Sequence, residues 1–168
     1  LNIKLDGLFL RRPISVCDYD DEEIKIIYKI VGKGTRAMAE MRQGQTLDVL
    51  TGLGNGYDSS KAGTSPVLIG GGVGIPPLYG LLKALQRQRA ADAKAARAAG
   101  ALAYGESAGT EKIRVILGFN TAEEIFYQNE FEAAGAEVLL ATADGSAGVL
   151  DERAAAWQPL SVSWLRKI

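Results

Sequence analysis

The chain has 168 residues, with 19 basic and 20 acidic side chains, a net charge of −1 and no histidine. This length fits one large or two small domains, and the near-neutral charge provides no basic field that would attract nucleic acid. The lack of histidine excludes a Ser–His–Asp or Cys–His nucleophile and a histidine-ligated metal within the chain.

Cys17 is the one cysteine of the chain, so neither an internal disulfide nor a complete set of cysteine ligands for a cluster can form. We expect it to be a small buried residue on a strand rather than a reactive thiol. No apolar run reaches the roughly 18 residues of a membrane helix, and no signal peptide is visible. We therefore expect a cytoplasmic protein without a membrane partner.

The first third of the chain has the pattern of antiparallel β structure. Asp6-Gly7 is typical of a hairpin turn, and strands are predicted within "RRPISVCDYD" and over residues 24–31, which are rich in β-branched and aromatic residues. The acidic run "DYDDEE" could hold an ion, but a solvated turn between two strands is the favoured interpretation. A glycine-rich turn then leads into a short helix with Thr35 near its start, followed by a strand in "QTLDVL" and a loop.

The polar segment "SSKAGTSP", residues 59–66, predicts a domain boundary. Beyond it, strand-like runs in "PVLIGGG", "KIRVILGFN" and "AEVLLATADG" alternate with helical patterns in "PPLYGLLKALQRQ" and "TAEEIFYQNEFEAAG". This β-α-β-α-β order indicates a parallel sheet with right-handed crossovers. Thr121 is expected to cap the second helix and Gly135 to end it.

Gly70, Gly71, Gly72 and Gly74 lie where the first of these strands runs into a helix that opens with two prolines. A helix start offers unpaired N–H groups and a partial positive charge, and glycines let the backbone approach a phosphate closely. Tight packing of strand against helix would also select glycine. The strand–loop–helix context favours a dinucleotide pyrophosphate site, although the absence of G-x-G-x-x-G argues against an ordinary dehydrogenase domain.

The first third contains a second set of candidate binding residues. Arg12 and Ser15 in "RRPIS" place a guanidinium and a hydroxyl near a strand, where they could bind a phosphate and a ring nitrogen. "GKGT", residues 32–35, could form a backbone nest for a phosphate. Together with the glycine loop, these segments suggest one cofactor in a barrel and another in the sheet.

The motifs "FLRRPISV", "IIYKIVGKGT", "DVLTGLGNGY", "LIGGGVGIPPLYGL", "ILGFNTAEEIF" and "TADGSAG" occur in that order. They closely resemble the electron-transfer subunit of class IB dihydroorotate dehydrogenase, in the ferredoxin-reductase-like superfamily. The resemblance implies a partial, antiparallel FAD-binding β-barrel over residues 1–60. It further implies a partial NAD-binding α/β domain with a parallel sheet over residues 65–149, and leaves a divergent tail over residues 150–168.

The resemblance also assigns binding residues. The FAD-binding residues it implies are Arg12, Pro13, Ile14, Ser15, Ile27, Tyr28, Lys29, Gly34 and Thr35. The residues facing NAD are Gly70, Gly71, Gly72 and Gly74. Flavin and nicotinamide supply the redox chemistry themselves, so we assign binding and positioning roles, no catalytic side chain and no metal ligand.

The function implied is transfer of electrons between FAD and NAD(H) in the dihydroorotate-to-orotate step of pyrimidine biosynthesis. In the family, a [2Fe–2S] cluster connects the FAD to an FMN-containing catalytic subunit within a heterotetramer. The cluster cysteines are absent here, and the chain is expected to be truncated at both ends. Acidic residues in "LGFNTAEE" favour NAD over NADP. The alternatives are a related NAD(P)H–flavin subunit of a ferredoxin:NADP⁺ or sulfide oxidoreductase, or a non-catalytic remnant.

Overall fold

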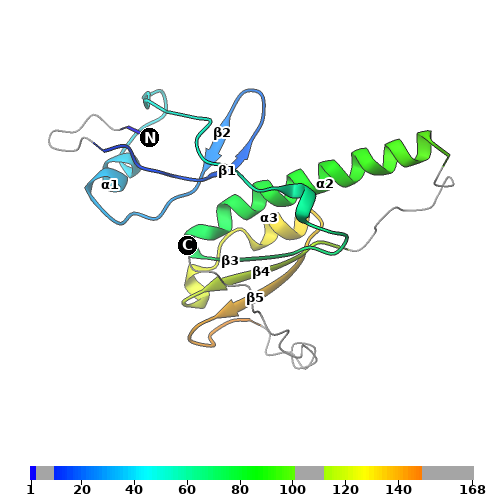
Figure 1. Cartoon of the computed structure of the whole chain (residues 1–168). Helices are drawn as coiled ribbons and strands as arrows, with labels where there is room; N and C mark the ends of the chain where they lie inside the picture. The colour runs from blue at the N-terminus through cyan, green and yellow to red at the C-terminus, as the bar shows by residue number, and fades with distance from the viewer. Residues whose placement is uncertain (3–9, 101–111, 149–168) are drawn as a thin grey trace.

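The computed structural model describes residues 1–2, 10–100 and 112–148 (Figure 1). An N-terminal region contains strands β1 (Val16–Tyr19) and β2 (Ile24–Ile26) and helix α1 (Lys33–Ala39). After the 3₁₀ turn η1 (Ser59–Lys61), an α/β region follows. Its elements are β3 (Val67–Gly71), η2 (Gly72–Gly74), α2 (Ile75–Ala98), β4 (Arg114–Phe119), η3 (Ala122–Glu124), α3 (Gln128–Ala133) and β5 (Glu137–Thr142).

The α/β region contains the predicted parallel sheet, with strand order β3-β4-β5. Side chains of the central strand β4 alternate, so that Val115, Leu117 and Phe119 are buried on one face. Helices α2 and α3 both cover that face (Figure 1). The core between the two layers also contains Leu68, Ile75, Leu78, Leu82, Leu85, Ile113, Phe131 and Ala136.

Helix α2 has an apolar stripe only along its first half. Ile75, Leu78, Leu82 and Leu85 are spaced by three or four residues and are all buried against the sheet. From residue 86 onward no residue of α2 is buried, and the alanine-rich helix extends past the sheet (Figure 1). No helix within the described ranges is long and apolar enough to span a bilayer.

The other face of the sheet retains exposed apolar side chains. Strand β3 lies at one end of the sheet formed by the described strands. On it, Val67 and Ile69 remain 39% and 70% exposed. Both helices therefore leave this face of β3 to solvent.

The expected β-barrel is not present in residues 1–2, 10–100 and 112–148, where the N-terminal region forms a two-stranded antiparallel sheet. Strand β2 is also shorter than the predicted strand over residues 24–31. Ile30 and Val31 are 53% and 78% exposed, and β-branched residues stabilise a strand only where they pack against a neighbour. "QTLDVL" forms an isolated bridge from Asp48 to Asn2 instead of a strand. The hairpin predicted at Asp6-Gly7 lies outside the described residues.

The acidic run between β1 and β2 forms the predicted turn. The Asp20 carboxylate accepts hydrogen bonds from the backbone N–H groups of Glu22 and Glu23, each at 2.9 Å. These bonds hold the pKa of Asp20 below its usual value. The charge of this carboxylate therefore serves to close the turn.

The second predicted helix, over residues 121–135, is divided. Its start is the short turn η3, and α3 begins only after Tyr127, whose φ of 66° is left-handed. The side chain of Thr121 does not cap η3, contrary to the prediction. Gly135 does end α3, with a φ of 84° and an N–H that donates to the Glu132 carbonyl at 2.8 Å.

Candidate functional site

The glycine-rich loop connects the end of β3 to the start of α2 through η2. The four glycines differ in role. A Cβ at Gly70 would lie 2.5 Å from Leu78 Cδ1 and 3.3 Å from the Gly74 carbonyl oxygen, so the Leu78 side chain would have to move to make room for it. Gly72 has a left-handed φ of 51°, and a Cβ at Gly72 or Gly74 would meet no atom within 4 Å. Gly70 thus packs closely against Leu78 of α2, whereas the other glycines leave open backbone at the helix start.

Gly71, the last residue of β3, adds to this open backbone and lies beside the neighbouring strand β4. It pairs with Gly118 of β4 at the carboxyl ends of both strands, where open α/β sheets bind ligands. A Cβ at Gly71 would be 3.6 Å from the Gly118 carbonyl oxygen, which is ordinary contact. Pro76 and Pro77 occupy the first turn of α2, where no helical hydrogen bond is lost. The residues fit a pyrophosphate, because backbone N–H groups are accessible at a helix start.

Arg12 and Gly34, both predicted to bind FAD, lie against each other in the N-terminal region. Gly34 is buried, and a Cβ there would collide with the Arg12 guanidinium. The guanidinium also donates to the Leu10 carbonyl oxygen at 2.8 Å. This contact places a cation beside the first turn of α1, and such a cation fits an anionic cofactor group.

The hydroxyl of Thr35 has a structural use within the same turn. It accepts hydrogen bonds from the N–H groups of Val31 and Gly32, at 3.0 and 3.2 Å, and donates to the Gly32 carbonyl oxygen. These bonds define the start of α1. To bind FAD, Thr35 would therefore have to use its backbone N–H, or its hydroxyl would have to give up one of these hydrogen bonds.

Of the remaining predicted flavin residues, Ile14, Ile27 and Tyr28 are half-buried, while Pro13 and Ser15 are exposed. Lys29 is exposed too, and its Nζ lies 3.6 Å from a carboxylate oxygen of Glu124 in η3. Hydrogen bonds from Asn120, assisted by the charge of Lys29, lower the pKa of Glu124. Lys29 is therefore directed toward the α/β region.

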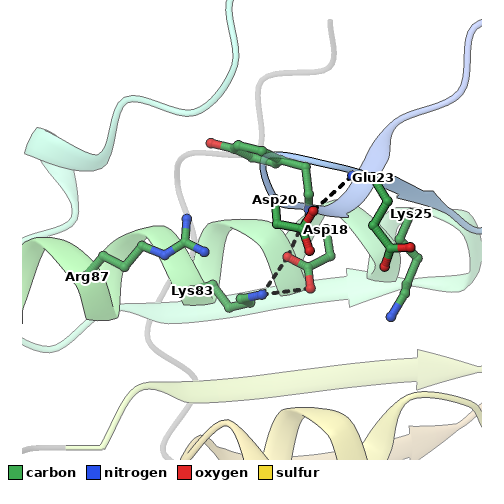
Figure 2. Close-up of a pocket in the computed structure, with 7 residues that line it drawn as sticks. Asp18, Asp20, Glu23, Lys25, Lys83 and Arg87 are labelled. Carbon is green, nitrogen blue, oxygen red and sulfur yellow. Dashed lines mark hydrogen bonds and ion pairs between the residues drawn. The ribbon is translucent and has the colours of Figure 1, made fainter.

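Sequence reasoning missed a contact between β1 and α2. Lys83 Nζ of α2 donates to both carboxylate oxygens of Asp18 in β1, each at 2.7 Å (Figure 2). Burial disfavours ionisation of Asp18, but the bonds from Lys83 and from the Tyr19 N–H outweigh it, and its pKa is lowered. The one sequence signal for this contact was Gly80, since glycine inside a helical pattern often marks close packing.

Cys17 is fully buried beside this contact, as expected of a small core residue. Burial raises the pKa of the Cys17 thiol above its usual value, and the nearby Tyr127 side chain opposes that rise only in part. A protonated, buried thiol is neither a nucleophile nor an accessible ligand. With one cysteine and no histidine in the sequence, the residues do not fit a [2Fe–2S] cluster.

The fold and the loop define a class of protein. A parallel sheet whose first strand enters an open glycine loop and a helix is the architecture of an α/β nucleotide-binding domain. The comparison with family models makes this more specific, since the model described as an oxidoreductase NAD-binding domain matches residues 68–155. The chain belongs to this family.

Similar proteins extend the likeness into the N-terminal region. One relative, from Fusobacterium nucleatum, is named dihydroorotate dehydrogenase B (NAD(+)), electron transfer subunit. It is 40% identical to this chain, and the match covers 83% of this chain and 47% of the relative. A Geobacillus relative of the same name is 38% identical, over 90% of this chain and 54% of the relative. These matches confirm the resemblance seen in the motifs. The chain spans about half the length of the curated relatives it matches.

A solved structure is also similar. It is the structure of the NADH-dependent reduced ferredoxin-NADP oxidoreductase, an enzyme studied for flavin-based electron bifurcation. The match has a TM-score of 0.58 and 29% identity, and covers 87% of this chain and 46% of that one. The ferredoxin-reductase-like fold expected from the sequence is thus supported for the α/β region.

Proposed function

We propose that this chain binds FAD through its N-terminal region and NAD(H) through the glycine loop, and passes electrons between them. The observation that carries the proposal is structural continuity. The candidate flavin segment, residues 12–15, leads directly into β1, and the candidate dinucleotide loop, residues 70–74, leads directly into α2. Since β1 and α2 contact each other, the two segments are held within one folded unit.

In this function, the chain's own residues bind and orient. The open backbone at Gly71, Gly72 and Gly74 would take the pyrophosphate of NAD(H), and Arg12 beside Gly34 would neutralise an anionic group of FAD. Bound nicotinamide and flavin supply transfer of a hydride, which carries two electrons and one proton. The protein's contribution to that transfer is close approach in a fixed orientation.

The relatives' names extend the proposal to a biological role. We infer an electron-transfer subunit of a dihydroorotate dehydrogenase, acting in the cytoplasm in pyrimidine biosynthesis with an FMN-containing catalytic subunit as partner. The [2Fe–2S] group expected in that family would need ligands from outside this chain. We therefore expect this chain by itself not to reduce such a partner with electrons from NADH.

The test is a flavin titration followed by reduction. The purified chain is titrated with FAD and freed of unbound flavin, and NADH is then added without oxygen. Bleaching of the bound flavin, and turnover of NADH with ferricyanide as acceptor, are the expected results. Protein that takes up no FAD would remove the flavin assignment, and bound FAD that NADH does not bleach would favour the non-catalytic alternative.

The similarity to the NADH-dependent reduced ferredoxin-NADP oxidoreductase structure favours a second candidate, a related flavin subunit. The neighbouring gene separates the two, because the second candidate is also NADH-dependent. Glu123 and Glu124 follow β4, where a 2′-phosphate would meet negative charge, so we expect NADH to be preferred. A neighbouring gene for a large glutamate-synthase-like flavoprotein would favour the second candidate, and one for a dihydroorotate dehydrogenase catalytic subunit would favour the first.

A further inference from the structure

Strand β1 and helix α2 are joined by an ion pair and by a close approach of their backbones. The contact comprises Cys17 and Asp18 of β1, Gly80 and Lys83 of α2, and Tyr127 before α3, which together we call the β1–α2 interface. Its charged part, seen in Figure 2, continues into a pocket of both signs of charge. The lining of that pocket includes Asp20, Glu23, Lys25 and Arg87.

The ion pair of this interface is partly shielded from water. The side chains of Lys83 and Asp18 are 30% and 20% exposed, and two hydrogen bonds of 2.7 Å join them. The chain offers a comparison in Lys61 and Asp58, which are 82% and 52% exposed. Pairs of the exposed kind contribute little to stability, whereas removal of one partner from a shielded pair is costly.

The backbones of β1 and α2 approach each other at a glycine. A Cβ at position 80 would lie 2.9 Å from the Cys17 carbonyl oxygen, closer than real Cβ contacts occur. On the other side, the side chain of Tyr127, a residue with a φ of 66°, lies close enough to Cys17 to influence the pKa of its thiol. A bulky residue keeps a left-handed backbone only where its surroundings hold it there. Strand β1 is thus held by contacts from two separate elements.

Chain continuity gives these contacts a consequence for both candidate cofactor segments. Residues 12–15 end where β1 begins, and Gly74 precedes α2 directly. Any displacement of β1 along or away from α2 therefore moves the flavin segment relative to the glycine loop. We propose that Asp18 and Lys83 are positioning residues, which hold the flavin segment at a fixed distance and orientation from the dinucleotide loop. This inference rests on the proposed function.

Cys17 provides a probe of the interface that needs no cofactor. It is the chain's single cysteine and is fully buried, so a thiol reagent reacts only when the interface opens. The experiment measures the rate of reaction with dithiobisnitrobenzoate in the parent chain, Lys83→Met, Asp18→Asn and the double variant. Lys61→Met is the matched control, since it removes an exposed ion pair elsewhere. Far-UV circular dichroism checks that each variant is folded.

We expect each single variant to react about tenfold faster than the parent, and Lys61→Met to stay within about twofold. The double variant should react no faster than the quicker single variant, because both remove the same interaction. Parent-like rates in both single variants, or rates that multiply in the double variant, would overturn the proposal. If Lys83→Met does not fold, Asp18→Asn, which preserves side-chain shape, decides the outcome.

The positioning role is then tested on the FAD-loaded chain. With the dissociation constants of FAD and NADH unchanged, the rate at which NADH bleaches the flavin should fall about tenfold in Asp18→Asn. An unaltered bleaching rate in a variant with a reactive Cys17 would reject positioning while leaving the interface in place. A chain that takes up no FAD would fail the proposed function instead, and the thiol measurement separates these two failures.

Discussion

Gly80 of α2 faces the carbonyl oxygen of Cys17 in β1 so closely that a Cβ at position 80 would lie 2.9 Å from that oxygen. In an isolated helix, alanine is more stable than glycine by about 1 kcal/mol. At this position the order should reverse. The two backbones can accommodate a methyl group only by moving apart, which weakens the contacts on both sides of it.

We predict that Gly80→Ala lowers the free energy of unfolding by about 1 kcal/mol, in spite of the gain in helix propensity. Urea denaturation followed by circular dichroism measures the change. Ala84→Gly, at an exposed position one turn further along α2, calibrates the ordinary cost of glycine in this helix. A Gly80→Ala chain that is more stable than the parent would show that β1 does not require the close approach.

The hydroxyl of Tyr127 lies near the buried Cys17 thiol, while its ring packs edge-on against Tyr79. We predict that Tyr127→Phe, which keeps the ring and removes only the hydroxyl, loses about 1 kcal/mol of stability, the order of a single polar contact. Tyr57→Phe, at a position 56% exposed, is the control and should be neutral within error. Equal stabilities for the two variants would contradict a stabilising role of the Tyr127 hydroxyl.

The ion pair should also make stability depend on pH. The folded-state pKa of Asp18 lies below its ordinary value of 3.8, so this carboxylate contributes stability above that pH and loses it as the pH falls through the folded-state value. In Asp18→Asn that contribution is absent at every pH. The difference in free energy of unfolding between parent and variant should therefore be constant near neutrality and shrink below about pH 4. Urea titrations at stepped pH measure it, and a constant difference down to acid pH would rule out this linkage.

The open backbone of the glycine loop gives a direct test of NAD(H) binding. Gly71 has an extended backbone, and a Cβ there makes only ordinary contact with Gly118. We predict that Gly71→Val weakens NADH binding at least about tenfold, because the side chain occupies the space a pyrophosphate would need. FAD affinity of the same variant is the internal control. Unchanged NADH binding would place the dinucleotide elsewhere.

Neighbouring arginines allow a matched test of FAD binding. Arg12 contacts Gly34, whereas Arg11 pairs with Asp48 at 2.6 Å. We predict that Arg12→Met weakens FAD binding at least about tenfold, while Arg11→Met binds FAD like the parent. Fluorescence quenching of FAD on binding measures both. Equal affinities for the two variants would separate Arg12 from the flavin site.

The α/β region was largely predictable from sequence because its signals are local. Strand β4 alternates in burial along its whole length, and α2 follows a stripe of apolar residues. The division of the second helix was not predictable. Tyr127 has a left-handed backbone, and its side chain lies against Cys17 and Tyr79. Both of these residues are distant from Tyr127 in the sequence. No local pattern encodes such a contact.

In the N-terminal region, local sequence signals predicted more strand structure than forms. Residues 24–31 have high β-propensity, yet only Ile24–Ile26 form a strand, because propensity becomes structure only where a neighbouring strand is present. The candidate binding residues were found through motif resemblance. Lys83 and Asp18 were missed, since a lysine on a helix and an aspartate on a strand are individually ordinary and become a pair only in the fold.

The exposed flank of β3 carries a practical consequence for handling the protein. Ile69 is 70% exposed, and its strand β3 is an edge strand of the sheet that the described residues form. A row of backbone donors and acceptors therefore lies beside an apolar surface. Such an edge recruits strands from other molecules. Self-association should therefore rise steeply with protein concentration. A charged side chain in place of Ile69 should raise the solubility limit, and this position lies outside both candidate cofactor segments.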